Sequence, residues 1–139
     1  MSYGMSSGIH QYQKVGAYGA AYADPHRLVQ MLLDGALDRL AQARGAMERN
    51  AIAEKAELIS KAGRIIEGLQ GSLDTDKGGD IAANLNDLYD YMQRRLLHAN
   101  VRNDVAALDE ISGLLREIRA AWEAIPMEYR QIPATGTAG

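Results

Sequence analysis

The sequence predicts an all-α protein, an antiparallel up-down four-helix bundle with a short extra N-terminal helix or strap. Three observations support this fold class. The apolar residues of the 139-residue chain are mainly Ala, Leu, Ile and Met, most of which favour helices, and strand formers are scarce. Apolar residues recur at spacings of three and four along four long segments. Short turns separate these segments, and such turns make consecutive helices antiparallel.

The first helix is predicted over about residues 25–49. Asp24 can cap its free N–H groups, and Pro25 suits the first helical position. Its expected core residues are Val29, Leu32, Leu33, Ala36, Leu40, Ala43 and Met47. Asn50 marks the turn that follows, and a second helix is predicted over about residues 52–73.

The second helix carries two neighbouring apolar stripes. The stripe expected to face the core consists of Ile52, Ala56, Ile59, Gly63, Ile66, Gln70 and Leu73. The other stripe consists of Leu58, Ala62, Ile65 and Leu69. Together they span about half of the cylinder, which is wider than the ~100° stripe of a typical surface helix.

The run from Asp74 to Gly79 is the clearest helix breaker in the chain. A third helix is predicted over about residues 80–99, with Ile81, Leu85, Leu88, Met92, Leu96 and Ala99 in register with the core. A turn at 100–104 should cap a fourth helix over about 104–125. Its core residues are expected to be Val105, Leu108, Ile111, Leu115, Ile118, Trp122 and Ile125.

Two segments flank the predicted bundle at residues 24–125. Residues 1–23 begin with small and polar side chains and read as a mobile N-terminal strap. Pro126 ends the last helix, and residues 126–139 are rich in Ala, Thr and Gly, which is typical of a flexible C-terminal tail. The chain is therefore expected to contain one domain.

Composition excludes several classes of protein. The net charge of −3 does not favour nucleic acid or an anionic membrane as a partner. The absence of cysteine excludes disulfide scaffolds, thiolate nucleophiles and thiolate zinc sites. No apolar run approaches the roughly 20 residues that a membrane span needs. The cytosol is the natural compartment for such a chain.

No constellation of residues indicates catalysis or a cofactor. His10, His26 and His98 are scattered, and none follows a Glu by three residues as in di-iron bundles. They are expected to cap helices or to face solvent. A histidine phosphotransfer bundle is the enzyme-like alternative, with His98 as its candidate. It needs an exposed histidine in mid-helix, whereas His98 lies near a predicted helix end.

Excess apolar surface is the most informative feature. Leu28 and Met31 lie off the predicted core stripe of the first helix, and Tyr91 and Leu97 lie off that of the third. Large exposed apolar patches usually mark interaction sites. The strap or a partner protein could cover this surplus. Broad buried faces in a tightly packed bundle would explain it equally well.

Several segments resemble the flagellin-specific export chaperone family, FliS. The most specific is Leu88-Tyr89-Asp90-Tyr91-Met92 together with the Gly-Gly turn that precedes it. Weaker matches are Ser7-Gly8-Ile9-x-x-Tyr12, the run from Ala23 to Ala36, Ala99-Asn100, Arg102-Asn103-Asp104 and the run from Gly113 to Trp122. The resemblance covers about residues 7–125.

The resemblance implies a non-enzymatic chaperone of the bacterial cytosol that needs no cofactor. Such proteins bind the disordered C-terminal segment of flagellin in apolar grooves and prevent premature polymerisation. They also aid delivery to the flagellar type III export gate. The export-gate protein and the flagellar anti-sigma factor are the further partners to expect. An adaptor for another secreted client is the alternative.

Ten residues are candidates for these roles. Those expected to bind the client are Leu28, Met31, Asn84, Leu88, Tyr91, Met92, Asn100 and Asn103. Met92 is also in register with the core, which favours packing over direct contact. Ile9 and Tyr12 match the N-terminal family motif associated with the export gate, and the same segment could act as a lid over a client groove.

Overall fold

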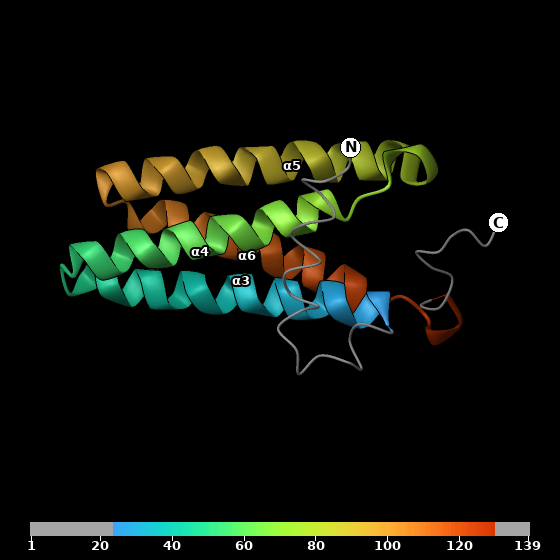
Figure 1. Cartoon of the computed structure of the whole chain (residues 1–139), viewed down its shortest axis with the longest axis horizontal. Coiled ribbons are helices and arrows are strands. Elements are labelled where there is room, and N and C mark those ends of the chain that lie inside the picture. The colour runs from blue at the N-terminus through green and yellow to red at the C-terminus, as the bar shows by residue number, and fades with distance from the viewer. Residues whose placement is uncertain (1–23, 130–139) are drawn as a thin grey trace.

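The computed structural model describes residues 24–129 and confirms the all-α fold class. Its elements, labelled as in Figure 1, are α3 (Pro25–Glu48), α4 (Ile52–Gly71), α5 (Thr75–Arg102), α6 (Val105–Glu123) and the 3₁₀ turn η1 (Met127–Tyr129). Consecutive helices run antiparallel, and the described residues contain no strand. None of the described helices is both long and apolar enough to cross a membrane.

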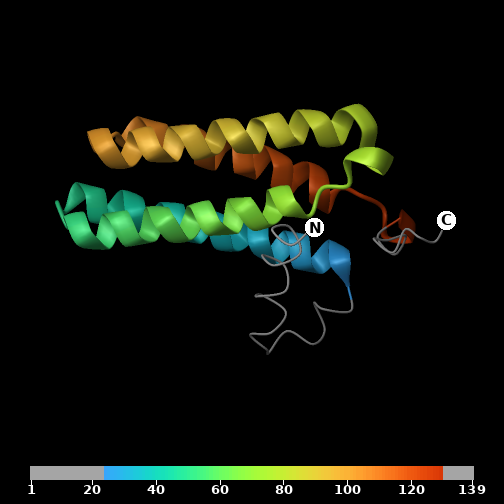
Figure 2. The ribbon, with the colours of Figure 1, turned by 45° about the horizontal axis from the view of Figure 1, so that its top comes forward.

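Each helix packs against two others, so the bundle closes on itself. The neighbours along the chain pair in order, and α6 returns to pack against α3. Figure 2 shows α3 and α4 as one layer and α5 and α6 as the other. Polar contacts such as Arg44–Asp109 at 2.8 Å and Arg119–Asp34 at 3.0 Å join α3 to α6 across the exposed edge.

Aspartate side chains begin three of the helices. Asp24 accepts hydrogen bonds from the backbone N–H groups of His26 and Arg27, and Pro25 occupies the first helical position, as predicted. Asp104 accepts from the Ala107 N–H at the start of α6. These caps satisfy donors that a helix leaves free at its first turn.

The predicted breaker at 74–79 is confirmed at its two ends, Asp74 and Gly79, and is wrong only for the single helical turn between them. Asp74 accepts hydrogen bonds from the N–H groups of Asp76 and Lys77, so α5 begins at Thr75. The backbone leaves the helical region only at Gly79, where φ is 54° and ψ is −132°. The C-terminal end also differs, because α5 continues to Arg102 and ends at Asn103 in the left-handed conformation.

The core is densest between α3 and α4, where small side chains let the two backbones approach. Ala36, Ala43 and Ala62 are fully buried, and the Ile65 side chain would lie 3.5 Å from a Cβ atom at Gly35. The largest fully buried side chains come from all four helices: Leu32, Leu33, Leu40, Ile66, Leu69, Met92, Leu108, Ile111 and Leu115. One core therefore joins the whole bundle.

Most of the apolar surface expected to be in excess on the first two helices is buried. Leu28 is only 5% exposed because it lies one turn before Leu32 on the same side of α3, so its predicted place off the core is wrong. The second stripe of α4, Leu58, Ala62, Ile65 and Leu69, is also buried in the core. The helix lies between α3 and α5, and it therefore needs two buried stripes.

The predicted register of the third helix is partly wrong. Ile81 is 74% exposed, whereas Ala82 and Tyr89 are buried. Ile81 lies about 100° around α5 from Ala82, and the face that α4 and α6 bury runs through Ala82, Tyr89 and Met92 instead. Leu97 is 66% exposed, in agreement with its predicted place outside the core.

Two glycine substitutions should change stability in opposite directions. Gly79→Ala should lower the free energy of unfolding by about 1–3 kcal/mol, because φ of 54° with ψ of −132° disfavours a side chain. Gly113→Ala should raise it by about 0.5–1 kcal/mol, because Gly113 is helical and a Cβ atom there meets nothing within 4 Å. Urea unfolding measures both, and equal effects of the two variants would contradict the assigned backbone at Gly79.

Candidate binding groove between α4 and α5

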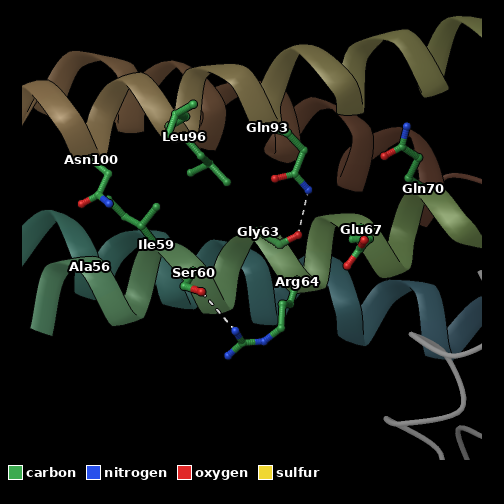
Figure 3. Close-up of a pocket in the computed structure, with 11 residues that line it drawn as sticks. Ala56, Ile59, Ser60, Gly63, Arg64, Glu67, Gln70, Gln93, Leu96 and Asn100 are labelled. Atoms are coloured by element: carbon green, nitrogen blue, oxygen red, sulfur yellow. Dashed lines mark hydrogen bonds between the residues drawn. The ribbon is translucent and has the colours of Figure 1, made fainter. Parts of the chain in front are cut away.

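A groove of about 420 Å³ runs between α4 and α5 (Figure 3). Buried Ile59 and Leu96 form its apolar part, next to the small residues Ala56 and Gly63. The remaining lining residues are Ser60, Arg64, Glu67, Gln70, Gln93, Leu97 and Asn100. We call this feature the α4–α5 groove.

The groove exists because α4 presents small residues toward α5. Because Gly63 has no side chain, its main-chain carbonyl is accessible from α5. The Gln93 side chain donates an Nε2–H hydrogen bond to this carbonyl at 2.8 Å (Figure 3). A Cβ atom at Gly63 would lie 3.2 Å from the Gln93 Oε1 atom. A larger residue at this position would displace Gln93 and fill the groove.

Side-chain amides form a second part of the groove. Gln70 of α4 donates from Nε2 to the side-chain oxygens of Asn86 and Asp90, each at 2.8 Å. Gln70, Gln93 and Asn100 follow one another along the groove in Figure 3. The interface of α4 with α5 is therefore joined by polar groups, in contrast to its alanine-rich interface with α3.

At one end of the groove, the side chain of Lys55 joins the start of α4 to the end of α5. It is only 4% exposed, and its Nζ atom donates to the Asn100 carbonyl oxygen at 2.9 Å and to the Asn103 Oδ1 atom at 3.1 Å. The Asn100 carbonyl belongs to the last turn of α5, where carbonyl groups lack helical partners and attract a cation. Lys55 thus acts as a cap for α5 supplied by α4.

Exposed apolar side chains lie at the same end. Leu97 lines the groove, and Val101 follows one turn later on α5 with 70% of its surface exposed. Ile52, at the start of α4, is 57% exposed. The Lys55 contacts bring the start of α4 to the end of α5, so Ile52 and Val101 belong to the two helix ends that meet at this end of the groove.

The predicted client-binding residues do not form one site. Asn100 lines the groove. Asn103 does not line it, but its side chain accepts a hydrogen bond from Lys55 at the same end. Leu28 and Met92 are buried in the bundle. The half-buried residues Met31 and Leu88 and the exposed Asn84 do not line the groove, and Ile9 and Tyr12 lie outside the described residues.

Tyr91 instead joins α5 to α6. Its hydroxyl donates to the Glu110 Oε2 atom at 2.5 Å, and Arg95 donates from Nε to Oε1 of the same carboxylate at 2.8 Å. The Tyr91 hydroxyl is the main cause that lowers the pKa of Glu110, and Arg95 adds to it. The same hydrogen bond raises the pKa of Tyr91. Arg94 lies over the Tyr91 ring, 5.9 Å from its centroid.

The two described histidines differ from each other. His26 is 5% exposed rather than solvated, since its ring stacks on Trp122 with centroids 4.9 Å apart. Its Nε2 atom donates to the Trp122 carbonyl at 2.8 Å, and the Trp122 indole donates to the His26 carbonyl at 2.9 Å. His98 lies in the last turns of α5, 3.0 Å from the Asp104 carboxylate. Among residues 24–129, no three acidic or histidine side chains converge on a point that could hold a metal ion.

Sequence reasoning missed Lys55, Gln70 and Gln93. Lysine is rarely buried, so nothing marked Lys55 except its spacing of three and four residues before Leu58 and Ile59. Gln70 belongs to the predicted core stripe of the second helix, and in the structure this stripe faces α5. The two small residues in the stripe, Ala56 and Gly63, were the available signal for a groove.

The described residues thus form a helical bundle with an open groove between α4 and α5, which is apolar at one end and lined by carboxamides along its side. The model of the family described as "Flagellar protein FliS" matches residues 8–129. The chain therefore belongs to the FliS family, which confirms the resemblance found in the motifs.

Three relatives illustrate the match. The chain is 52% identical over 118 residues to the flagellar secretion chaperone FliSB of Pseudomonas aeruginosa, covering 84% of this chain and 94% of the relative. It is 49% identical over 122 residues to the flagellar secretion chaperone FliS of Salmonella typhimurium, covering 86% and 90%. The FliS protein of Bacillus subtilis is 35% identical over 115 residues, covering 82% and 85%.

The Tyr91–Glu110 contact should make stability depend on acid pH. The pKa of Glu110 is lowered from 4.5 in the folded state, so its stabilising contribution is present above pH 4.5 and is lost as the pH falls through the lowered value. Glu110→Gln should therefore lower the urea midpoint near pH 6.5. The same substitution should lower the urea midpoint less near pH 2.5, because the fall in pH shifts Glu110 of the original chain toward the same neutral state. An equal difference at both pH values would show that the carboxylate charge has no role.

Proposed function

We propose that this chain is a flagellar secretion chaperone that holds the C-terminal segment of flagellin in the α4–α5 groove. The open groove, with the exposed side chain of Leu97 in its lining, is the observation that carries this proposal. Membership of the FliS family supports the chaperone class, since the relatives are named flagellar secretion chaperones. Binding would occur in the bacterial cytosol, before export.

The energetics of the groove suit a disordered client. An amphipathic segment can fold as a helix with its apolar face in a groove between two helices. Each client Leu or Ile that becomes buried contributes about 1.5–3 kcal/mol, and part of this offsets the ordering of the client. A handful of such side chains is enough for a stable complex. The covered segment would then be unable to take part in filament assembly.

Delivery requires a second partner. We propose the flagellar export-gate protein for this role, with the segment around Ile9 and Tyr12 as its contact because these residues match the family motif. The flagellar anti-sigma factor is a further partner to test. An adaptor for a different secreted client would use the same groove and is the alternative function.

Titration calorimetry with the C-terminal ~40 residues of the organism's flagellin tests the proposal, since several helix-in-groove contacts need a segment of about this length. Saturable one-to-one binding with a large negative heat-capacity change is expected, because apolar surface is buried as the client folds. The absence of binding at micromolar concentrations would exclude flagellin as the client. Other secreted flagellar proteins would then be titrated in its place.

Two matched surface variants locate the binding site. Leu97→Ser should weaken flagellin binding about tenfold or more, because a client-covered leucine contributes about 1.5–3 kcal/mol. Ile81→Ser serves as the control, since Ile81 is similarly exposed on the same helix but does not line the groove. Serine is neutral, so both variants leave the charges at the helix ends unchanged. Equal affinities of the two variants would place the client elsewhere.

A further inference from the structure

The carboxamides of the α4–α5 groove have hydrogen-bonding capacity that the bundle does not use. Asn100 lines the groove, yet apart from the helical hydrogen bonds of α5 only its main-chain carbonyl is engaged, by Lys55. Among the described residues its side chain makes no hydrogen bond. Gln93 uses one N–H group on the Gly63 carbonyl, and no described donor reaches its Oε1 atom. No buried side-chain polar atom of the described residues lacks a partner, so these groups are open to water in the free protein.

Docking of a client would remove this water. A polar group that loses water and gains no partner weakens binding, commonly by about tenfold for each group. A client with a wholly apolar face would leave the Asn100 and Gln93 carboxamides without water and without a hydrogen-bonding partner. A client that offers hydrogen-bonding side chains at the right places would not, so the groove discriminates between the two.

The spacing of the two carboxamides indicates which client positions matter. Gln93 and Asn100 are seven residues apart, which corresponds to two helical turns or about 10.5 Å along α5. A helix lying in the groove presents its own side chains on one face at the same interval. A polar residue at one position of an apolar repeat is also a known means to specify the register of paired helices.

We propose that Gln93 and Asn100 select a client helix that carries carboxamide or hydroxyl side chains two turns apart within its apolar face, and that they determine its register. This inference rests on the proposed docking of the client in the α4–α5 groove. Lys55 is the positioning residue. It holds the last turn of α5 through the Asn100 carbonyl and leaves the Asn100 carboxamide free for the client.

Asn100→Leu is the decisive variant. The Asn100 side chain makes no described hydrogen bond and leucine favours helices more than asparagine does, so the variant should fold at least as stably. It also adds apolar surface to the groove. If docking were only hydrophobic, Asn100→Leu would bind the flagellin C-terminal segment as tightly as the original chain or more tightly. Our proposal requires the opposite, a loss of about tenfold.

The experiment compares three proteins by calorimetry with the same flagellin C-terminal segment: the original chain, Asn100→Leu and the control Gln42→Leu. Gln42 is an exposed amide on α3, outside the groove, where it bonds to Asp38. The proposal expects a loss of about tenfold for Asn100→Leu and none for Gln42→Leu. Unchanged or tighter binding by Asn100→Leu overturns it while leaving the proposed function intact. No binding by the original chain overturns the proposed function and this inference with it.

A second measurement tests register directly. Cysteine is absent from the chain, so a single Ser60→Cys variant can carry a cross-linker at the groove. The flagellin segment should cross-link at one position, or at positions one turn apart, in the Ser60→Cys protein. It should cross-link over a wider range when Asn100→Leu is added. The same narrow pattern in both proteins contradicts a role of Asn100 in setting register.

Discussion

The arrangement of this bundle depends on how α4 divides its surface between two neighbours. Toward α3, alanines permit a close approach, and the larger side chains of α4 fill the shared core. Toward α5, the small residues are Ala56 and Gly63, but here polar amides and a groove occupy the interface. Small residues thus have opposite effects on the two sides, because only α3 comes close enough to fill the space that they leave.

The buried ammonium of Lys55 places a second constraint on the bundle. A charge without a carboxylate partner among the described residues is costly to bury, unless good acceptors surround it. Here the acceptors are the Asn100 carbonyl and the Asn103 side chain at the end of α5. The position of the α5–α6 turn and the shape of the groove are therefore coupled to a single side chain from α4.

Much of the fold could be predicted, because its signals are local. Asp24, Pro25 and Asp104 act within one turn of the chain, and the spacing of Leu32, Leu40 and Met47 defines a face without reference to other helices. The exposure of Ile81, the burial of Lys55 and the stacking of His26 on Trp122 depend on residues far away in sequence. The groove could not be predicted for the same reason, since which stripe of α4 faces α5 is decided by the closure of the whole bundle.

The His26–Trp122 contact gives the molecule an optical property of its own. Trp122 is the only tryptophan in the chain, and its indole ring stacks on an imidazole at the interface of α3 with α6. This interface lies on the opposite side of the bundle from the α4–α5 groove. The fluorescence emission of Trp122 therefore reports a separation of α3 from α6. A ligand in the α4–α5 groove should leave this emission unchanged unless the bundle itself opens.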